Sequence, residues 1–177
     1  DPWDTNRYLN IWVCNIESGD LGQIMGFTYP PIEINEALNF TSSEAQPNWN
    51  NFNIQVEDSA LQGIVINYTA IGPLNPQAEV DGFNQNDLGR TLVHEVGHFL
   101  GLRHIWGDAI LNNVCEVDDG INDTPSQAFS SFYNCDFSLN SCEDENGIVL
   151  PDMVENYMDY SSESCMNIFT VNQIEVM

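Results

Sequence analysis

The sequence contains no lysine and only three arginines, Arg7, Arg90 and Arg103, among its 177 residues. Against these stand 27 aspartates and glutamates, which give a formal net charge of −24 at pH 7. Binding to nucleic acid or to anionic lipid needs a basic surface, so the composition disfavours both functions. The acidic excess favours basic substrates, and it is equally expected of a protein adapted to solubility or salt.

The sequence also lacks any apolar run of about eighteen residues, so no membrane-spanning helix is predicted. It begins at Asp1 without an initiating methionine or a signal-like segment, and we therefore expect a processed or excised piece. An apolar composition of 42% over 177 residues is sufficient for a hydrophobic core. No internal repeat or long linker divides the chain, and we predict one domain over residues 1–177.

All three histidines lie within eleven residues, in a run that reads H-E-x-x-H-x-x-G-x-x-H from His94 to His104. Residues four apart lie on the same face of a helix, so His94 and His98 can present two imidazole nitrogens to one metal ion. Glu95 lies on the flank of that face, where its carboxylate can reach a water molecule without binding the metal. Ordinary histidines in a chance match are the alternative, and the added glutamate and glycine disfavour it.

Gly101 explains how a third ligand can reach the same ion. Glycine readily adopts the left-handed conformation that ends a helix, and the turned chain then brings His104 back to the metal. Three histidines leave a fourth position open, which distinguishes a catalytic zinc from a structural one. We predict that Asn86 or Asp87 caps this helix, and that one face packs inward through residues at helical spacing: Leu88, Thr91, Leu92, Glu95, Val96 and Phe99.

The five cysteines divide into one early residue and four late ones. Cys115, Cys135, Cys142 and Cys165 follow the histidine run in a region rich in Asp, Asn, Ser and Gly. Four cysteines in such a region indicate two disulfides and an oxidising compartment, with three pairings open. Cys14 lies in a β-like run, and we expect a buried thiol there rather than a metal ligand.

The strongest predicted strands cover residues 8–16 and 63–70, with a weaker one at residues 24–29. Residues 35–60 have no clean period and are predicted to be mainly loop. A long irregular stretch from residue 105 to about 165 needs cross-links or ions to be stable. Within it, residues 116–124 gather carboxylates, an amide and a hydroxyl, which suits calcium or, equally, a solvated acidic loop.

The histidine run with Gly101 resembles the metzincin clan of zinc endopeptidases, and Asn-Tyr-Met-Asp-Tyr at residues 156–160 resembles its methionine turn. Further matches are Gly-Arg-Thr-Leu-Val before His94, His-Ile-Trp-Gly-Asp from His104, Asp-Thr-Pro at 123–125, and Cys165 after the methionine turn. Together they resemble the pappalysin family, including its small microbial members. This resemblance implies an α/β (α+β) fold, with a twisted mixed β-sheet, the active-site helix above it, and an irregular lower part stapled by disulfides and calcium.

The resemblance also assigns residues. It implies the disulfides Cys115–Cys142 and Cys135–Cys165, an upper subdomain over residues 1–101 and a lower one over residues 102–177. Met158 would form an apolar floor under the zinc histidines, and Tyr160 would hydrogen-bond the tetrahedral intermediate. Calcium would be bound by the side chains of Asp119 and Thr124 and the carbonyls of Asp118 and Asn122.

We therefore predict a secreted zinc endopeptidase acting on protein or peptide substrates, with Glu95 as its general base. Microbial pappalysins that cut before Arg or Lys keep an acidic residue after the methionine turn, and Glu163 is the local candidate for this contact. The strand at residues 63–70 is predicted to pair with an extended substrate. A calcium-dependent binding or adhesion module derived from a protease is the alternative function.

Overall fold

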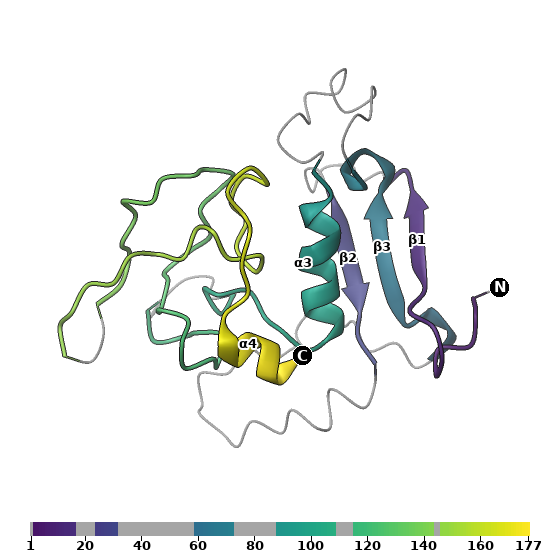
Figure 1. Cartoon of the computed structure of the whole chain (residues 1–177), viewed down its shortest axis with the longest axis horizontal. Coiled ribbons are helices and arrows are strands. Elements are labelled where there is room, and N and C mark those ends of the chain that lie inside the picture. Colours follow the sequence, from purple (N-terminus) through teal and green to yellow (C-terminus); the bar gives the residue numbers. More distant parts are fainter. Residues whose placement is uncertain (1, 17–23, 32–58, 73–87, 109–114, 144–145) are drawn as a thin grey trace. The chain divides into compact units, whose positions relative to one another are not determined.

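Figure 1 shows the computed structural model, which describes residues 2–16, 24–31, 59–72, 88–108, 115–143 and 146–177. The described residues up to Gly101 form one compact unit, and those from Leu102 onward form a second. The predicted loop at residues 35–60 lies almost entirely outside the described residues. In the described part of the chain, no helix has the length and apolar character that a membrane span needs.

The first unit contains a mixed three-stranded sheet in the order β1-β3-β2 (Figure 1), with β1 at Ile11–Cys14, β2 at Gly26–Tyr29 and β3 at Gly63–Asn67. β1 runs parallel to β3, and β2 runs antiparallel to it. Each strand lies inside a range that the sequence predicts, because β-branched and aromatic residues predominate in all three runs. The predicted mixed sheet is thus confirmed.

β3 is the central strand of this sheet, and its Ile64 and Ile66 are fully buried. Both of its edges are hydrogen-bonded, so the prediction that this strand pairs with substrate is wrong. The strand ends at Asn67, whose side chain accepts a hydrogen bond from the Thr69 backbone N–H at 3.2 Å and caps the 3-10 turn Tyr68–Ala70. Among the described strands, β2 is the outer one beside the helix.

Among the described strands, β1 lies at the other edge of the sheet, and this position corrects the prediction for Cys14. The thiol of Cys14 is exposed rather than buried. Ile11 and Val13 on the same strand are also exposed, at 42% and 51%. An apolar run predicts a strand, but it does not predict whether other elements pack over the side chains of that strand. The side chains of an edge strand are buried only where a second layer packs on them.

The active-site helix α3 extends over Arg90–Phe99 and packs against β2 and β3. It begins later than predicted, because Gly89 takes a left-handed conformation with φ 76° and occupies the cap position. A Cβ at Gly89 would lie 3.2 Å from the carbonyl oxygen of Ile71. Gly89 therefore lies close to the residue that follows the 3-10 turn Tyr68–Ala70. Leu88 is exposed before the helix, and the predicted caps Asn86 and Asp87 lie outside the described residues.

The second unit is largely irregular and is built around a small apolar core. Five buried residues form this core: Leu102, Ile105, Trp106, Ile121 and Met158. A short helix, α4, covers Val171–Val176 near the C-terminus. Thr170 and Gln173 begin it with a reciprocal capping box, each side chain bonding the other's backbone.

Two disulfides link distant parts of this irregular unit. They are Cys115–Cys142 and Cys135–Cys165, the pairing that the resemblance implies. Each closes a loop with a sequence separation of 27 or 30 residues. In the chain-entropy model a loop of this size stabilises the fold by roughly 3 to 4 kcal/mol, so the cross-links replace part of a core that the loops cannot form.

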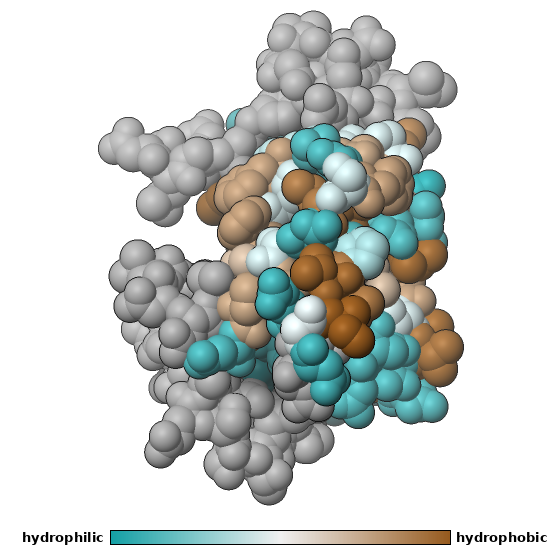
Figure 2. Space-filling view, turned by 90° about the vertical axis from the view of Figure 1, so that its left-hand side faces the viewer, coloured by the Kyte–Doolittle hydropathy of each residue, from teal (hydrophilic) through white to brown (hydrophobic). Residues whose placement is uncertain are grey.

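The surface of the molecule is not uniformly polar despite the acidic composition. Figure 2 shows brown apolar side chains lying among teal hydrophilic ones on one face. Exposed aromatic residues of the second unit include Phe129, Phe132 and Phe137. Exposed apolar side chains are common on folded proteins, and these carry no functional assignment.

Candidate metal centre and catalytic residues

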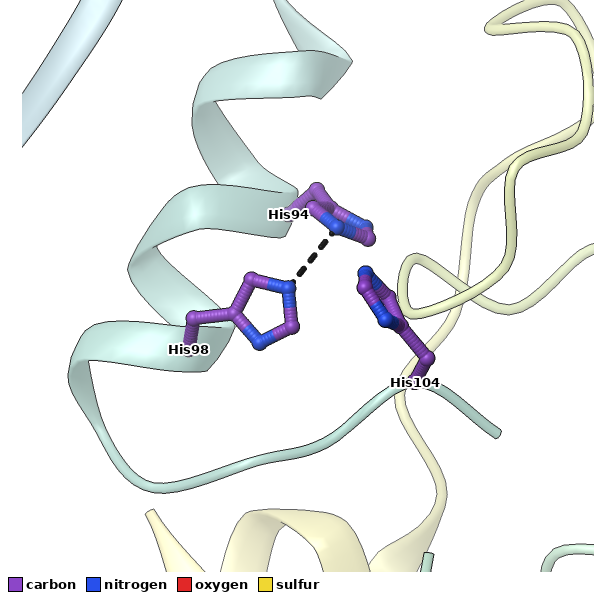
Figure 3. Close-up of side chains that lie close together, drawn as sticks. All are labelled: His94, His98 and His104. Carbon is purple, nitrogen blue, oxygen red and sulfur yellow. Dashed lines mark hydrogen bonds between the residues drawn. The ribbon is translucent and has the colours of Figure 1, made fainter. Parts of the chain in front are cut away.

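The three histidines converge as the sequence predicts. His94 and His98 project from successive turns of α3, and the ring of His104 faces them from the segment after the helix (Figure 3). One ligand nitrogen from each histidine lies within 4.8 Å of the others. The Nε2 atoms of His94 and His98 are 3.0 Å apart, so both nitrogens point to one place. Three imidazole donors grouped in this way fit a zinc ion.

Gly101 makes this convergence possible. The helix ends at Phe99, and the Gly101 N–H bonds the His98 carbonyl at 3.0 Å. Gly101 then takes a φ of 99°, in the region that favours glycine, and turns the chain. The side chain of His104 reaches the cluster only because of this turn, as the sequence predicts.

Asp108 holds the ring of His104 in place. Its Oδ1 atom lies 2.6 Å from His104 Nδ1. With a proton assigned to Nδ1, that nitrogen donates to the carboxylate, and Nε2 is the atom that can bind a metal. The ring also stacks on Trp106, with centroids 4.3 Å apart and planes 7° from parallel. Sequence reasoning missed Asp108, although its place four residues after His104, in a motif already quoted, was the available signal.

Glu95 lies buried on α3, beside β2. Its Oε2 atom accepts a hydrogen bond from the Thr28 hydroxyl at 2.7 Å, and its backbone carbonyl lies 2.9 Å from the same hydroxyl. A buried carboxyl group needs hydrogen-bond partners, and the Thr28 hydroxyl supplies one. This partner is 67 residues away in sequence, and nothing in the local sequence indicates it.

Tyr160 and Met158 lie in the predicted methionine turn of the second unit. Tyr160 is 41% exposed, and its ring contacts His104 edge-on with centroids 4.6 Å apart. Its phenol therefore lies in the neighbourhood of a metal ligand and open to solvent. Met158 is fully buried, and its carbonyl accepts a hydrogen bond from the Ile105 N–H at 3.3 Å. The predicted roles of both residues stay predictions.

Asp159, between these two residues, ties the methionine turn to a neighbouring loop. Its Oδ1 accepts hydrogen bonds from the Ser131 N–H at 3.1 Å and from Gln127 Nε2 at 3.2 Å. Its Oδ2 is buried and has no hydrogen-bond partner among the described residues. Burial raises the pKa of Asp159 above its ordinary value, although the hydrogen bonds from Ser131 and Gln127 act in the opposite direction.

We expect Asp159→Asn to stabilise the protein at neutral pH. The amide keeps the two acceptor bonds and removes a buried charge, which should raise the free energy of unfolding by about 1 kcal/mol and the melting temperature by about 2 to 4 °C. The pKa of Asp159 is higher in the folded than in the unfolded protein. Its contribution to the free energy of unfolding is therefore fully present below the pKa of the unfolded state and is lost as pH rises through the pKa of the folded state. Calorimetry at pH 5 and pH 8 should show a larger gain at pH 8, and an equal gain at both would contradict this account.

The acidic loop places Asp119 and Thr124 together. Asp119 Oδ1 accepts hydrogen bonds from the Thr124 hydroxyl at 2.7 Å and the Ile121 N–H at 3.0 Å. Asp119 Oδ2 is buried and without a hydrogen-bond partner among the described residues. Burial raises the pKa of Asp119 to about 7, against the effect of these hydrogen bonds. An oxygen-rich loop with one unpartnered buried oxygen fits a hard cation such as calcium. Asp118 and Asn122, whose carbonyls are the other predicted ligands, are exposed.

Arg103 connects the acidic loop electrostatically to the turn that follows His104. Its guanidinium is buried, and burial lowers the pKa of Arg103, while the carboxylates of Asp108, Asp119 and Asp118 act to raise it. The two segments also touch through backbone: a Cβ at Gly107 would lie 2.7 Å from the N and O atoms of Asp118. Gly107 has a φ of 65°, so glycine is required there on two counts.

Glu163, the predicted contact for a basic substrate residue, is fully buried in the segment after the methionine turn. Cys165 fixes this segment through its disulfide to Cys135. An acidic side chain enclosed in this way can form the end of a pocket or a structural contact. Its role in substrate binding stays a prediction.

A mixed sheet with an adjacent helix that carries two histidines, followed by a glycine turn and a third, defines the metzincin class of metallopeptidases. The chain belongs to the Peptidase M43 family, described as pregnancy-associated plasma protein-A, whose model matches residues 75–177. The resemblance to metzincins and pappalysins is thus confirmed.

Relatives of known name agree with this family. An extracellular metalloprotease of Arthroderma benhamiae is 42% identical over 106 residues, covering 59% of this chain and 34% of that protein. One of Sordaria macrospora is 30% identical over 169 residues, covering 96% of this chain and 46% of that protein. Mature mirolysin of Tannerella forsythia, solved with a cleaved peptide, matches with a TM-score of 0.67 and 36% identity over 98% of this chain and 52% of mirolysin. The chain thus spans between about a third and a half of the relatives it matches.

Proposed function

We propose that the chain is the catalytic part of a zinc-dependent endopeptidase that is secreted and cleaves protein or peptide substrates. The observation that carries this proposal is the cluster of His94, His98 and His104, with the buried carboxylate of Glu95 one residue from the first ligand. The names of the relatives, extracellular metalloproteases and a mirolysin with a cleaved peptide, support it. In this proposal both compact units belong to one catalytic domain.

In this proposal the three histidines hold zinc through neutral imidazole nitrogens, with Asp108 orienting His104. A zinc ion bound there would supply Lewis acidity to the reaction. Glu95 accepts a proton from the attacking water at its carboxylate and passes it to the leaving amine. The exposed phenol of Tyr160 donates a hydrogen bond to the oxyanion, which is the charge that develops in peptide hydrolysis.

Substrate would bind in an extended conformation along β2. Among the described strands, this one is the outer strand beside the helix with Glu95, and strand addition uses an outer strand of a sheet. Glu163 and the net charge of −24 support a preference for a basic residue after the cut bond.

The function is tested by incubating the chain with a quenched peptide library, with and without a zinc chelator. Cleavage that stops on chelation and returns with one zinc per chain is the expected result. Mass analysis of the products would show which residue follows the cut bond. Zinc-loaded, folded chain that cleaves no peptide would overturn the proposal and would favour a binding module, the alternative that the comparisons do not support.

We further propose that Asp119 and Thr124 form part of a structural calcium site. We expect calcium at one hundred times its Kd to raise the free energy of unfolding by about 2.7 kcal/mol, because only the folded loop binds it. Asp119→Asn should abolish this gain. Asp123→Asn is the matched control, since Asp123 lies in the same loop but bonds the Asn172 N–H instead. A melting temperature of the parent protein that does not respond to calcium would overturn the proposed calcium site.

A further inference from the structure

Two residues of β2 face the side chain of Glu95. Gly26 and Thr28 are two apart, so they lie on the same face of the strand, the one toward α3. The Thr28 hydroxyl lies 2.7 Å from Glu95 Oε2. A Cβ placed on Gly26 would lie 3.0 Å from Glu95 Cγ, from Glu95 Oε1 and from Ile66 Cδ1. Thr28 therefore donates a hydrogen bond to the Glu95 carboxylate, while Gly26 leaves room for the Glu95 side chain.

The hydrogen bond from Thr28 stays with Glu95 whichever acceptor it uses. A hydroxyl has one proton, and the two acceptors within reach are Oε2 and the backbone carbonyl of the same Glu95, at 2.7 and 2.9 Å. The shorter contact goes to the carboxylate, as expected for a bond to a charged acceptor. Both Thr28 and Glu95 are more than nine-tenths buried, so water competes little for this bond.

The position of the Thr28 hydroxyl is set by the sheet. Thr28 is paired with Ile64 of β3, and Gly26 is paired with Ile66. Both isoleucines are fully buried in the central strand. Pairing with them fixes the register of β2 and therefore the position of Thr28 relative to α3. Threonine is β-branched and has a restricted χ1 angle, so its hydroxyl has little freedom once the backbone is fixed.

We propose that Thr28 is a positioning residue for Glu95, and that the absence of a side chain at Gly26 leaves room for the carboxylate. The inference rests on the proposed function, in which Glu95 moves the proton. The Thr28 hydroxyl acts through Glu95 and does not itself contact the substrate. A catalytic group displaced by about 1 Å can lose about a hundredfold in rate, which is why a fixed donor beside it matters.

A merely structural role for the same hydrogen bond makes a different prediction. In that case, loss of the hydroxyl would weaken the packing of β2 on α3 and lower the melting temperature, while kcat per folded molecule would not change. A positioning role lowers kcat and leaves KM nearly unaltered, because the interaction matters in the reaction step and not in substrate binding.

The experiment compares Thr28→Val, which removes the hydroxyl at similar shape, with Thr28→Ser, which keeps it. Zinc-loaded protein is assayed for kcat and KM on one quenched peptide, and melting temperatures are recorded. We expect Thr28→Val to lower kcat by about 10- to 100-fold with KM within about twofold, since a bond to a charged group is lost. Thr28→Ser should recover kcat to within about threefold of the parent protein.

Two further variants complete the test. Thr69→Val is the matched control, because Thr69 is a buried threonine whose hydroxyl bonds Asn67 Oδ1 at 3.0 Å on the same unit. It should lower stability without changing kcat. Gly26→Ala keeps the Thr28 hydroxyl but crowds Glu95, and it should lower kcat at unchanged KM even if Thr28→Val fails to fold.

The inference is overturned if Thr28→Val keeps kcat within twofold of the parent protein. It is also overturned if the valine and serine variants lose kcat equally, since packing would then be the cause. If Gly26→Ala retained full kcat, the proposed role of Gly26 would be refuted. A parent protein that cleaves no peptide would instead refute the proposed function, and the inference with it.

Discussion

Glu95→Gln should abolish nearly all peptide cleavage while leaving the fold and the metal centre intact. Glutamine has the size of glutamate and can still accept from the Thr28 hydroxyl, which bonds Glu95 Oε2 in the parent protein. It cannot accept the proton of the attacking water. A general base typically contributes a factor of 10² to 10⁴, so we expect kcat to fall by about that factor, with KM little changed. Steady-state cleavage of a quenched peptide measures both constants.

The control for this prediction is the metal content. Glutamine at position 95 leaves His94, His98 and His104 unchanged, so bound zinc should remain at one ion per chain, and the melting temperature should rise slightly or stay the same. A buried charge is removed in the variant, which argues against loss of stability. If Glu95→Gln kept more than a tenth of the parent kcat, another group would have to be the base.

Removal of the Cys135–Cys165 disulfide should have a large effect on stability. We expect Cys135→Ser with Cys165→Ser to lower the free energy of unfolding by about 3 to 4 kcal/mol, as the chain-entropy model gives for a loop of this length. This bridge fixes the segment after the methionine turn, and near Cys135 the Tyr133 N–H bonds the carbonyl of Tyr160 in the turn at 2.6 Å. Activity should therefore fall along with stability, as measured by calorimetry and peptide cleavage.

The Cys115–Cys142 pair offers a matched comparison. It closes a loop of nearly the same length, so the chain-entropy model predicts a similar loss of stability. It lies away in sequence from the methionine turn, and at a temperature where both variants are folded its loss should affect kcat less. Equal kcat in the two double variants would show that the Cys135–Cys165 bridge only stabilises and does not hold Tyr160 in place.

The metal centre could be predicted from the sequence because its parts are local. Helical spacing places His94 and His98 on one face, and the left-handed preference of glycine at position 101 returns the chain at His104. The strands could be predicted for the same reason, since β-branched runs specify extended backbone whatever their neighbours are. The disulfide pairing came from the family resemblance, since cysteine spacing left three pairings open.

Features that depend on distant parts of the chain could not be predicted. The central place of β3 follows from pairing with strands whose order no local pattern states, and this order exposes Cys14 at the edge. The bond between Thr28 and Glu95 joins residues 67 apart. The start of α3 at Arg90 depends on the close approach of Gly89 to Ile71, which likewise overrides the local capping pattern.

The close backbone contact between Gly107 and Asp118 has a consequence for protein engineering. The turn after His104 and the acidic loop share one backbone contact, with no room between them for even a methyl group. A longer loop grafted into residues 115–124 would push on Asp108 and thus on the ring of His104. Loop exchange and insertional libraries should therefore leave this stretch untouched and begin instead at Gly147, where an added side chain would meet open space, although its φ of 75° favours keeping the glycine itself.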